Sequence, residues 1–185
     1  LRAIPNLKVF RPADINETFE CWEIALKNKN TPSAIALSRQ KLPYINPKFS
    51  EDNKSEKGAY VVKMDSHDNK VTLIASGSEV ELALNVNKAL KENNIESKVV
   101  SMPCQELFDK QSDNFKKDIL DDDTLIVSIE AGNVSSWKKY LGNNGLSLGI
   151  DKFGESAPYK KVYEHLDLSV EKIVLAIQEK LRKLS

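Results

Sequence analysis

The first 45 residues show a pattern of apolar and polar positions that predicts a strand, a helix and a second strand. Residues 7–10 alternate and end just before Pro12. Asp14 stands three residues before Glu17, a capping-box spacing that predicts a helix start. Apolar side chains then recur every three or four positions, at Ile15, Phe19, Trp22 and Leu26. The apolar run 33–37 is typical of a parallel strand buried on both faces, so we expect one βαβ unit without a sheet to complete it.

After residue 40 the composition of the chain becomes more polar. Between residues 40 and 58 Lys, Pro, Asn, Ser, Glu and Asp predominate, which predicts a linker. Strands are expected at 60–64, 71–75, 98–101, 124–129 and 147–150, and helices at 80–93, 135–141 and 170–184. Turn-rich residues 65–69 predict that the first two of these strands form a hairpin or a strand pair. The alternation predicts an α/β fold, a mostly parallel, doubly wound open sheet of Rossmann-like type covered on both faces.

Composition and charge narrow the classes of function. The 185 residues are 41% hydrophobic, with 27 Lys and Arg against 27 Asp and Glu. A zero net charge removes the general electrostatic case for nucleic acid or an anionic membrane as a partner. No apolar stretch approaches the roughly 20 residues that span a bilayer. The start, residues 1–5, has neither a signal-peptide core nor an initiator Met, so we expect a soluble chain truncated at its front.

The cysteines and histidines offer no clear catalytic or metal-binding pattern. Cys21 and Cys104 are far apart and form no CxxC pair, so reduced thiols of a cytoplasmic protein are expected. Cys104 has no histidine near it in sequence, which argues against a nucleophile. His67 is expected in a solvated loop and His165 at a helix end. We interpret Trp137 and Tyr140 on their short helix as packing residues, with an interface role open.

A strand followed by Ser76, Gly77 and Ser78 and then a helix is one layout that holds phosphate at free backbone N–H groups. Ser78 also stands three residues before Glu81, the spacing of a capping box. Glu79 and Glu81 would repel an anion at this helix start. The capping interpretation is therefore favoured over the anion site.

Two charged residues follow predicted strands at the edge where open α/β sheets bind ligands. Arg39 comes after the strand 33–37 and can offer paired N–H donors to a phosphate or carboxylate, although a surface ion pair is the commoner role. Glu130 ends the strand before Ala131 and Gly132. It can bind a ligand or a neighbouring chain, but capping of the next turn is favoured.

Six motifs together resemble the transketolase family in their order and spacing. They are Leu1-Arg2-Ala3-Ile4-Pro5-Asn6, Phe10-Arg11-Pro12-Ala13-Asp14, Leu37-Ser38-Arg39-Gln40, Ala75-Ser76-Gly77-Ser78-Glu79-Val80, Val100-Ser101-Met102-Pro103 and Phe153-Gly154-Glu155-Ser156-Ala157-Pro158. The resemblance covers nearly the whole chain. It implies that residues 1–45 are the end of a pyrimidine-binding domain, 46–57 a linker and 58–185 a transketolase C-terminal domain.

The resemblance also implies a cytoplasmic homodimeric transferase of the pentose phosphate pathway. Such an enzyme uses thiamine diphosphate and a divalent metal, Mg²⁺ or Ca²⁺, to move a two-carbon ketol unit from a ketose phosphate to an aldose phosphate. The family's cofactor, metal and catalytic groups belong upstream of Leu1, so none is assigned here and no cofactor is expected on this segment alone. Only Arg39 matches a family site position, the Arg of Ser-Arg-Gln that contacts the sugar phosphate.

Three interpretations follow from these observations. The leading one is a C-terminal portion of a transketolase that is inactive alone and contributes Arg39 and dimer packing. A separately encoded subunit of a split transketolase-like enzyme is the first alternative. The second alternative makes residues 56–185 an independent regulatory domain that binds a small anion at the Ser76-Gly77-Ser78 loop.

Overall fold

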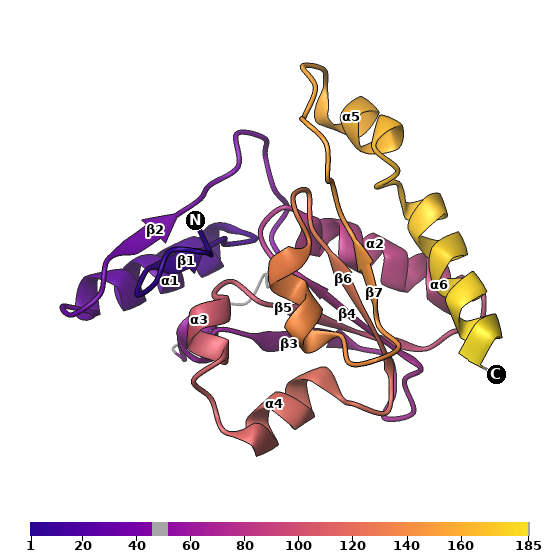
Figure 1. The fold of residues 1–185 in the computed structure, drawn as a ribbon, viewed down its shortest axis with the longest axis horizontal. Coiled ribbons are helices and arrows are strands. Elements are labelled where there is room, and N and C mark those ends of the chain that lie inside the picture. The colour runs from indigo at the N-terminus through magenta and orange to yellow at the C-terminus, as the bar shows by residue number, and fades with distance from the viewer. Residues whose placement is uncertain (46–51, 185) are drawn as a thin grey trace.

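The computed structural model describes residues 1–45 and 52–184 and confirms the expected βαβ unit at the N-terminus (Figure 1). Strand β1 (Lys8–Phe10) pairs in parallel with β2 (Ser33–Ile35), and helix α1 (Ile15–Lys27) connects them. These two strands form a sheet of their own. A small core holds this unit to the rest of the molecule, because buried Phe10 and Cys21 pack with Cys104 from the other domain.

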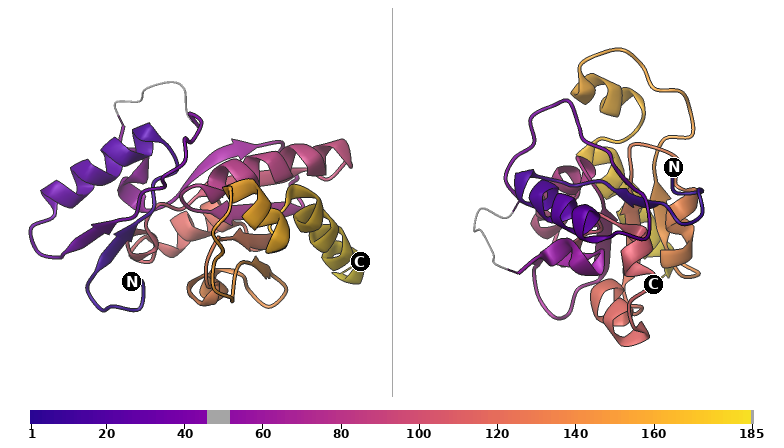
Figure 2. Two further views of the ribbon diagram at one scale, coloured as in Figure 1. Left: turned by 90° about the horizontal axis from the view of Figure 1, so that it is seen from above. Right: turned by 90° about the vertical axis from the view of Figure 1, so that its left-hand side faces the viewer.

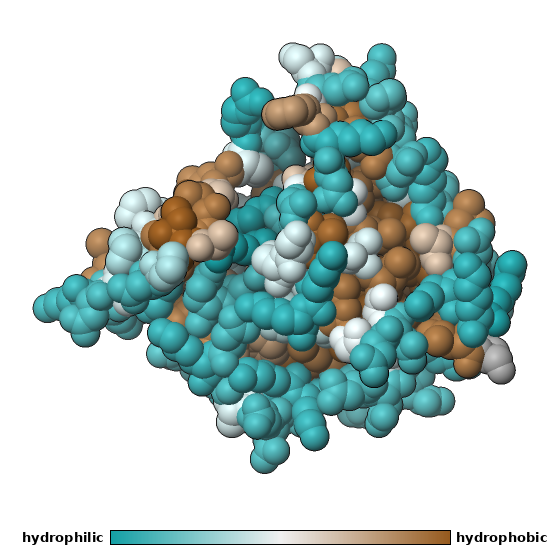
Figure 3. Space-filling model, viewed as in Figure 1, coloured by the Kyte–Doolittle hydropathy of each residue, from teal (hydrophilic) through white to brown (hydrophobic). Residues whose placement is uncertain are grey.

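The apolar face of α1 lies exposed along this unit. The side chains expected on one helical face do share it, but their exposed fractions are 46% for Ile15, 67% for Phe19, 50% for Trp22 and 73% for Leu26. The expected burial of 33–37 on both faces is also wrong, since β2 is half-buried and Leu37 is 59% exposed. Apolar side chains gather over this unit at the left of Figure 3. Nothing in the described residues covers either surface.

The second domain is a five-stranded open sheet in the order β3-β5-β4-β6-β7. Its strands are β3 (Tyr60–Met64), β4 (Val71–Ala75), β5 (Ser97–Ser101), β6 (Leu125–Ile129) and β7 (Leu146–Leu148). The expected pairing of the first two strands is wrong, because β3 runs antiparallel to β5 instead. Fully buried β4 takes the centre between two parallel strands, whereas β3 carries exposed Lys63 and Met64 and fits an edge.

Helices cover both faces of this sheet, which confirms the doubly wound α/β class. Leu73 belongs to the core under α2 (Glu79–Glu92) and α6 (Val170–Leu184), while Ile74 joins the core of the opposite face. That second core includes residues of the 3₁₀ helix η2 (Ser135–Tyr140), α3 (Gln105–Phe108) and α4 (Asp113–Leu120). None of the helices within the described ranges is long and apolar enough to cross a membrane.

Two short helices, α3 and α4, were not predicted from the sequence, and α5 (Tyr159–His165) was expected only through the placing of His165 at a helix end. They hold four, eight and seven residues, too few for a clear apolar period. In the predicted linker, residues 46–51 lie outside the described part of the chain. Residues 54–57 form a 3₁₀ helix, η1 (Lys54–Lys57), in which buried Ser55 donates both its N–H and its hydroxyl to Glu20 of α1.

Candidate functional site

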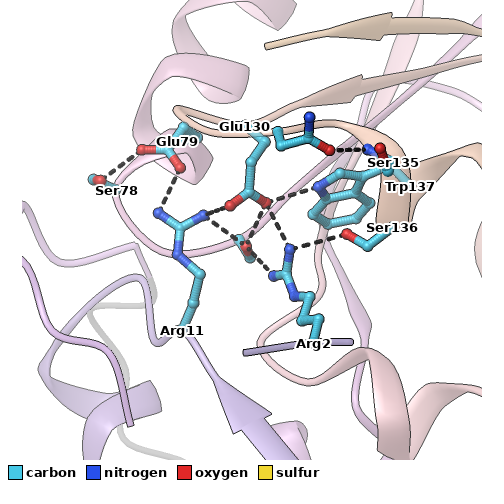
Figure 4. A network of polar contacts seen from close by, with 10 residues as sticks. Arg2, Arg11, Ser78, Glu79, Glu130, Ser135, Ser136 and Trp137 are labelled. Atoms are coloured by element: carbon cyan, nitrogen blue, oxygen red, sulfur yellow. Dashed lines mark hydrogen bonds and ion pairs between the residues drawn. The ribbon is translucent and has the colours of Figure 1, made fainter. Parts of the chain in front are cut away.

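The N-terminal βαβ unit meets the larger domain at the carboxyl edge of its sheet (Figure 2). Ser76 follows β4 and Glu130 follows β6, and both are buried at this edge. Two arginines of the N-terminal unit, Arg2 and Arg11, point into the same place (Figure 4). In open α/β sheets this edge is where ligands bind, so here the chain's own guanidinium groups occupy that position.

Arg11 is the centre of the network. Its Nη2 lies 2.7 Å from Oε2 of Glu79, its Nη1 pairs with Oε1 of Glu130, and Nη1 is 3.3 Å from Oγ of Ser76. Burial opposes the charged form, but the carboxylates of Glu79 and Glu130 outweigh it and raise the pKa of Arg11. The charged form is thus favoured in a site where an unpaired charge would be costly.

Glu130 does not cap the following turn, so that expectation is wrong. Its carboxylate accepts from Nη1 of Arg2 at 3.0 Å and from the indole Nε1 of Trp137 at 2.7 Å, in addition to its ion pair with Arg11. Two cations and one indole N–H satisfy this carboxylate more fully than a single backbone N–H can. The partners of Glu130 belong to the same chain, a role that was not considered from the sequence.

The loop after β4 is closed by Arg11. The N–H of Gly77 donates to the Arg11 carbonyl oxygen at 2.8 Å, and a Cβ at Gly77 would lie 3.3 Å from Nη2 of Arg11. The expected capping box is wrong, because the Ser78 side chain caps no backbone N–H and instead donates to Oε1 of Glu79 at 2.6 Å. Through these contacts the loop 76–78 packs against the N-terminal unit. This packing argues against the alternative in which the loop binds a small anion.

A second polar contact between the domains centres on Glu17, which is fully buried at the start of α1. Its carboxylate accepts from Oγ of Ser101 at 2.6 Å, from the hydroxyl of Tyr60 at 2.8 Å and from the N–H of Ala13 at 2.7 Å. Burial raises the pKa of Glu17 to about 7, although these hydrogen bonds act in the opposite direction. The expected cap at Asp14 is confirmed, since its Oδ1 accepts from the Glu17 N–H at 2.8 Å.

Arg39 lies outside the Arg11 network. It is exposed four positions beyond the end of β2, and no ion pair or hydrogen bond joins it to another of the described residues. Its guanidinium is therefore accessible, as a ligand-binding Arg must be. No observation here tests its contact with a phosphate, so that role stays a prediction.

The two histidines and the two cysteines also lie outside the Arg11 network. His67 is exposed in the turn between β3 and β4. His165 is the last residue of α5, with Nε2 3.2 Å from Oε1 of Glu155. Both cysteines are free and buried, and burial raises the pKa of Cys104 to about 12, which disfavours the thiolate that a nucleophile needs.

Trp137 and Tyr140 are packing residues, as expected. Both are buried, and their rings meet edge to face with centroids 6.2 Å apart. Within the described ranges no three His, Cys, Asp or Glu side chains come together as a possible metal site.

Sequence reasoning missed the two arginines, Glu79 and the burial of Glu17. Arg11 and Glu79 stand inside two of the six motifs, which was the one available signal. A charged residue has the same appearance in a sequence whether it is solvated or buried in a pair. Only the meeting of the two domains distinguishes these cases.

An open, mostly parallel sheet joined through buried charges to a βαβ unit defines a chain built from two α/β domains. The family described as "Transketolase-like TK C-terminal domain" matches residues 58–169, and "Transketolase, pyrimidine binding domain" matches residues 1–45. The chain belongs to the transketolase family.

Relatives and solved structures agree with this assignment. The transketolase of Sinorhizobium medicae is 44% identical over 99% of this chain. The chain spans 26% of that relative, about a quarter of its length. A Pichia stipitis transketolase structure in complex with sedoheptulose 7-phosphate superposes with a TM-score of 0.90 at 33% identity, covering 98% of this chain and 26% of that one. A structure titled split gene transketolase, inactive beta4 tetramer, gives a TM-score of 0.78 at 26% identity, covering 98% and 60%.

The indole of Trp137 offers a first test of the network. Replacing Trp137 by Phe removes one hydrogen bond to the buried Glu130 carboxylate, so we expect the free energy of unfolding to fall by about 2 kcal/mol. Trp22→Phe is the matched control, because this half-exposed side chain should change stability by no more than about 0.5 kcal/mol. Urea unfolding followed by circular dichroism measures both, and equal losses in the two variants would contradict the role of the indole.

Proposed function

We propose that this chain is part of a transketolase that transfers a two-carbon ketol unit from a ketose phosphate to an aldose phosphate. The observation that carries the proposal is the match to two transketolase domains in consecutive ranges of one chain. The enzyme would use thiamine diphosphate and a divalent metal, Mg²⁺ or Ca²⁺, bound by residues outside this chain. We assign residues 1–45 to the pyrimidine-binding domain, 46–57 to a linker and 58–185 to the C-terminal domain.

Within this enzyme we assign Arg39 to the phosphate group of the sugar substrate. The side chain is exposed beyond the carboxyl end of β2, and within the described residues nothing competes for its guanidinium. An Arg fork can give a phosphate two parallel, charge-assisted hydrogen bonds. Holding the phosphate fixes the far end of the substrate and so orients its carbonyl for reaction.

The exposed face of α1 supports packing against more polypeptide. Phe19, Trp22 and Leu26 are each half or more exposed along one helix, and contiguous apolar surface of this kind marks an interaction site. We assign this face to the remainder of the pyrimidine-binding domain and the subunit contacts of a homodimer. The buried free cysteines fit a reducing compartment, so we place the enzyme in the cytoplasm.

A separately encoded subunit is the second candidate. It is favoured by the likeness to the structure titled split gene transketolase, of which this chain covers 60%. Under that arrangement a partner chain supplies the cofactor site. The size of the polypeptide that carries this sequence in cell extract, on a denaturing immunoblot, separates the candidates. A band several times larger than 20.8 kDa supports one long chain, and a band near this size supports a split enzyme.

Activity tests the proposal itself. Purified alone and supplied with thiamine diphosphate and Mg²⁺, this chain should give no ketol transfer, because we assign the groups that bind the cofactor and the metal to residues outside this chain. The long chain, or the chain with its partner, should transfer the unit between sugar phosphates. Loss of turnover on removal of thiamine diphosphate is the control. An assembled enzyme without ketol transfer would overturn the proposal.

A further inference from the structure

The loop that carries Arg39 begins and ends on one short segment of the chain, residues 10–14. At its start, the N–H of Ala36 donates to the Phe10 carbonyl oxygen at 2.9 Å. At its end, the N–H of Ile45 donates to Oδ2 of Asp14 at 2.9 Å. Residues 37–44 between these anchors are exposed or only partly buried. The segment 10–14 thus anchors the loop at both of its ends.

Arg11, in the middle of that segment, fastens it to the C-terminal domain. Its N–H donates to the carbonyl of Pro103 at 2.9 Å, and its carbonyl accepts from the N–H of Gly77 at 2.8 Å. Its guanidinium forks onto the carboxylates of Glu79, the first residue of α2, and Glu130, which follows β6. Main chain and side chain therefore hold the base of the Arg39 loop at the same point.

The loop also borders a groove of the C-terminal domain. Gln40, next to Arg39, lines a groove of 380 Å³ together with Ser78 and Tyr163. The hydroxyl of Tyr163 donates to Oε1 of Glu79 at 2.8 Å, while Oε2 of the same carboxylate is paired with Arg11. One fully buried carboxylate of the C-terminal domain thus contacts both Arg11, at the base of the loop, and Tyr163, in the groove that Gln40 lines.

We infer that Arg11 and Glu79 are positioning residues for Arg39, through which the C-terminal domain sets the affinity for the phosphate of the substrate. The inference rests on the proposed phosphate role of Arg39. Bidentate hydrogen bonding needs a fixed fork, and a shift of about 1 Å in a substrate-positioning group can cost about 100-fold in rate. Anchoring the base of the loop limits such shifts, while the Arg39 guanidinium stays exposed to substrate.

A purely structural role for this pair predicts a different outcome. Damage to folding lowers the fraction of active enzyme, which lowers kcat for every substrate and leaves KM unchanged. Loss of positioning raises KM for phosphorylated substrates and leaves unphosphorylated ones unaffected. The ratio of the two KM values therefore separates the explanations.

The experiment uses the assembled enzyme with either Arg11→Lys or Glu79→Gln. Lysine keeps the charge but cannot fork onto two carboxylates, and glutamine keeps the shape of Glu79 without its charge. We expect KM for a phosphorylated aldose acceptor to rise about tenfold in each variant, with KM for an unphosphorylated acceptor within about twofold of the parent. Glu23→Gln is the matched control, because it removes an exposed ion pair with Lys27, and its KM values should not change.

The same substitutions made in an Arg39→Ala enzyme complete the test. Without Arg39 there is nothing left to position, so Glu79→Gln should then change KM by less than about twofold. If Glu79→Gln still raises KM about tenfold in the Arg39→Ala enzyme, the positioning role is overturned. It is also overturned if Arg39→Ala is selective for phosphorylated substrates but Arg11→Lys and Glu79→Gln change no KM. In both cases the proposed function of Arg39 still stands. If Arg39→Ala itself shows no selectivity for phosphorylated substrates, the proposed function of Arg39 fails, and the inference fails with it.

Discussion

Arg39→Ala in the assembled enzyme is expected to raise KM for phosphorylated substrates by about 10- to 150-fold. This range corresponds to about 1.5–3 kcal/mol for the loss of a charge-assisted, bidentate contact. Unphosphorylated substrates lack the group that Arg39 would hold, so their KM should stay within about twofold. Initial rates with a matched pair of acceptors, one phosphorylated and one not, give the two KM values directly.

Lys41→Ala is the control for this prediction. It removes a positive charge from the same exposed loop, two positions away, without removing the fork. A general electrostatic effect on anionic substrates would appear in both variants and would fade with added salt. Equal changes for both classes of substrate in Arg39→Ala would contradict the phosphate role.

The second large effect is expected in the pH dependence of stability, through Glu17. Its pKa is about 7 in the fold against a reference of 4.5, so the folded chain holds this proton more tightly than the unfolded one. Stabilisation from the protonated carboxyl is complete below pH 4.5 and is lost as pH rises through 7. The difference corresponds to about 3 kcal/mol. Urea unfolding at intervals from pH 5 to pH 8 measures it.

Glu17→Gln isolates this contribution. The amide does not titrate, so subtracting its unfolding free energies from those of the parent should leave a difference that falls with pH. Ser101 and Tyr60 face the carboxylate as hydrogen-bond donors, and Asp14 is the neighbouring charge that also raises the pKa. Glu92→Gln, on the exposed end of α2, should keep the parent's pH profile. If the unfolding free energy of Glu17→Gln depended on pH as that of the parent does, the pH dependence could not be assigned to Glu17.

Several elements were predictable because local spacing reflects local geometry. The period of α1 and its cap at Asp14 depend on residues within one or two turns, and both appear as expected. The apolar runs at 71–75 and 124–129 likewise predicted strands, and the structure has β4 and β6 there, buried on both faces. Arg39 was found only through a motif, and its functional role stays a prediction.

Other features could not be read from the sequence because they depend on contacts between distant segments. β3 lies beside β5 because its partly exposed side chains suit the edge of the sheet. The turn-rich residues 65–69 instead suggested that β3 pairs with β4. The exposed face of α1 was unexpected for a similar reason, since periodicity shows which residues share a face and is silent about what covers it.

The sequence by itself determined the strands and the longer helices, the doubly wound α/β class and membership of the transketolase family. The tertiary structure decided how the two domains meet. Arg11 and Glu130 are 119 positions apart, and both would suit a solvated surface equally well. When the N-terminal unit packs against the carboxyl ends of β4 and β6, both charges become buried. Each buried charge then needs the other as its ion-pair partner.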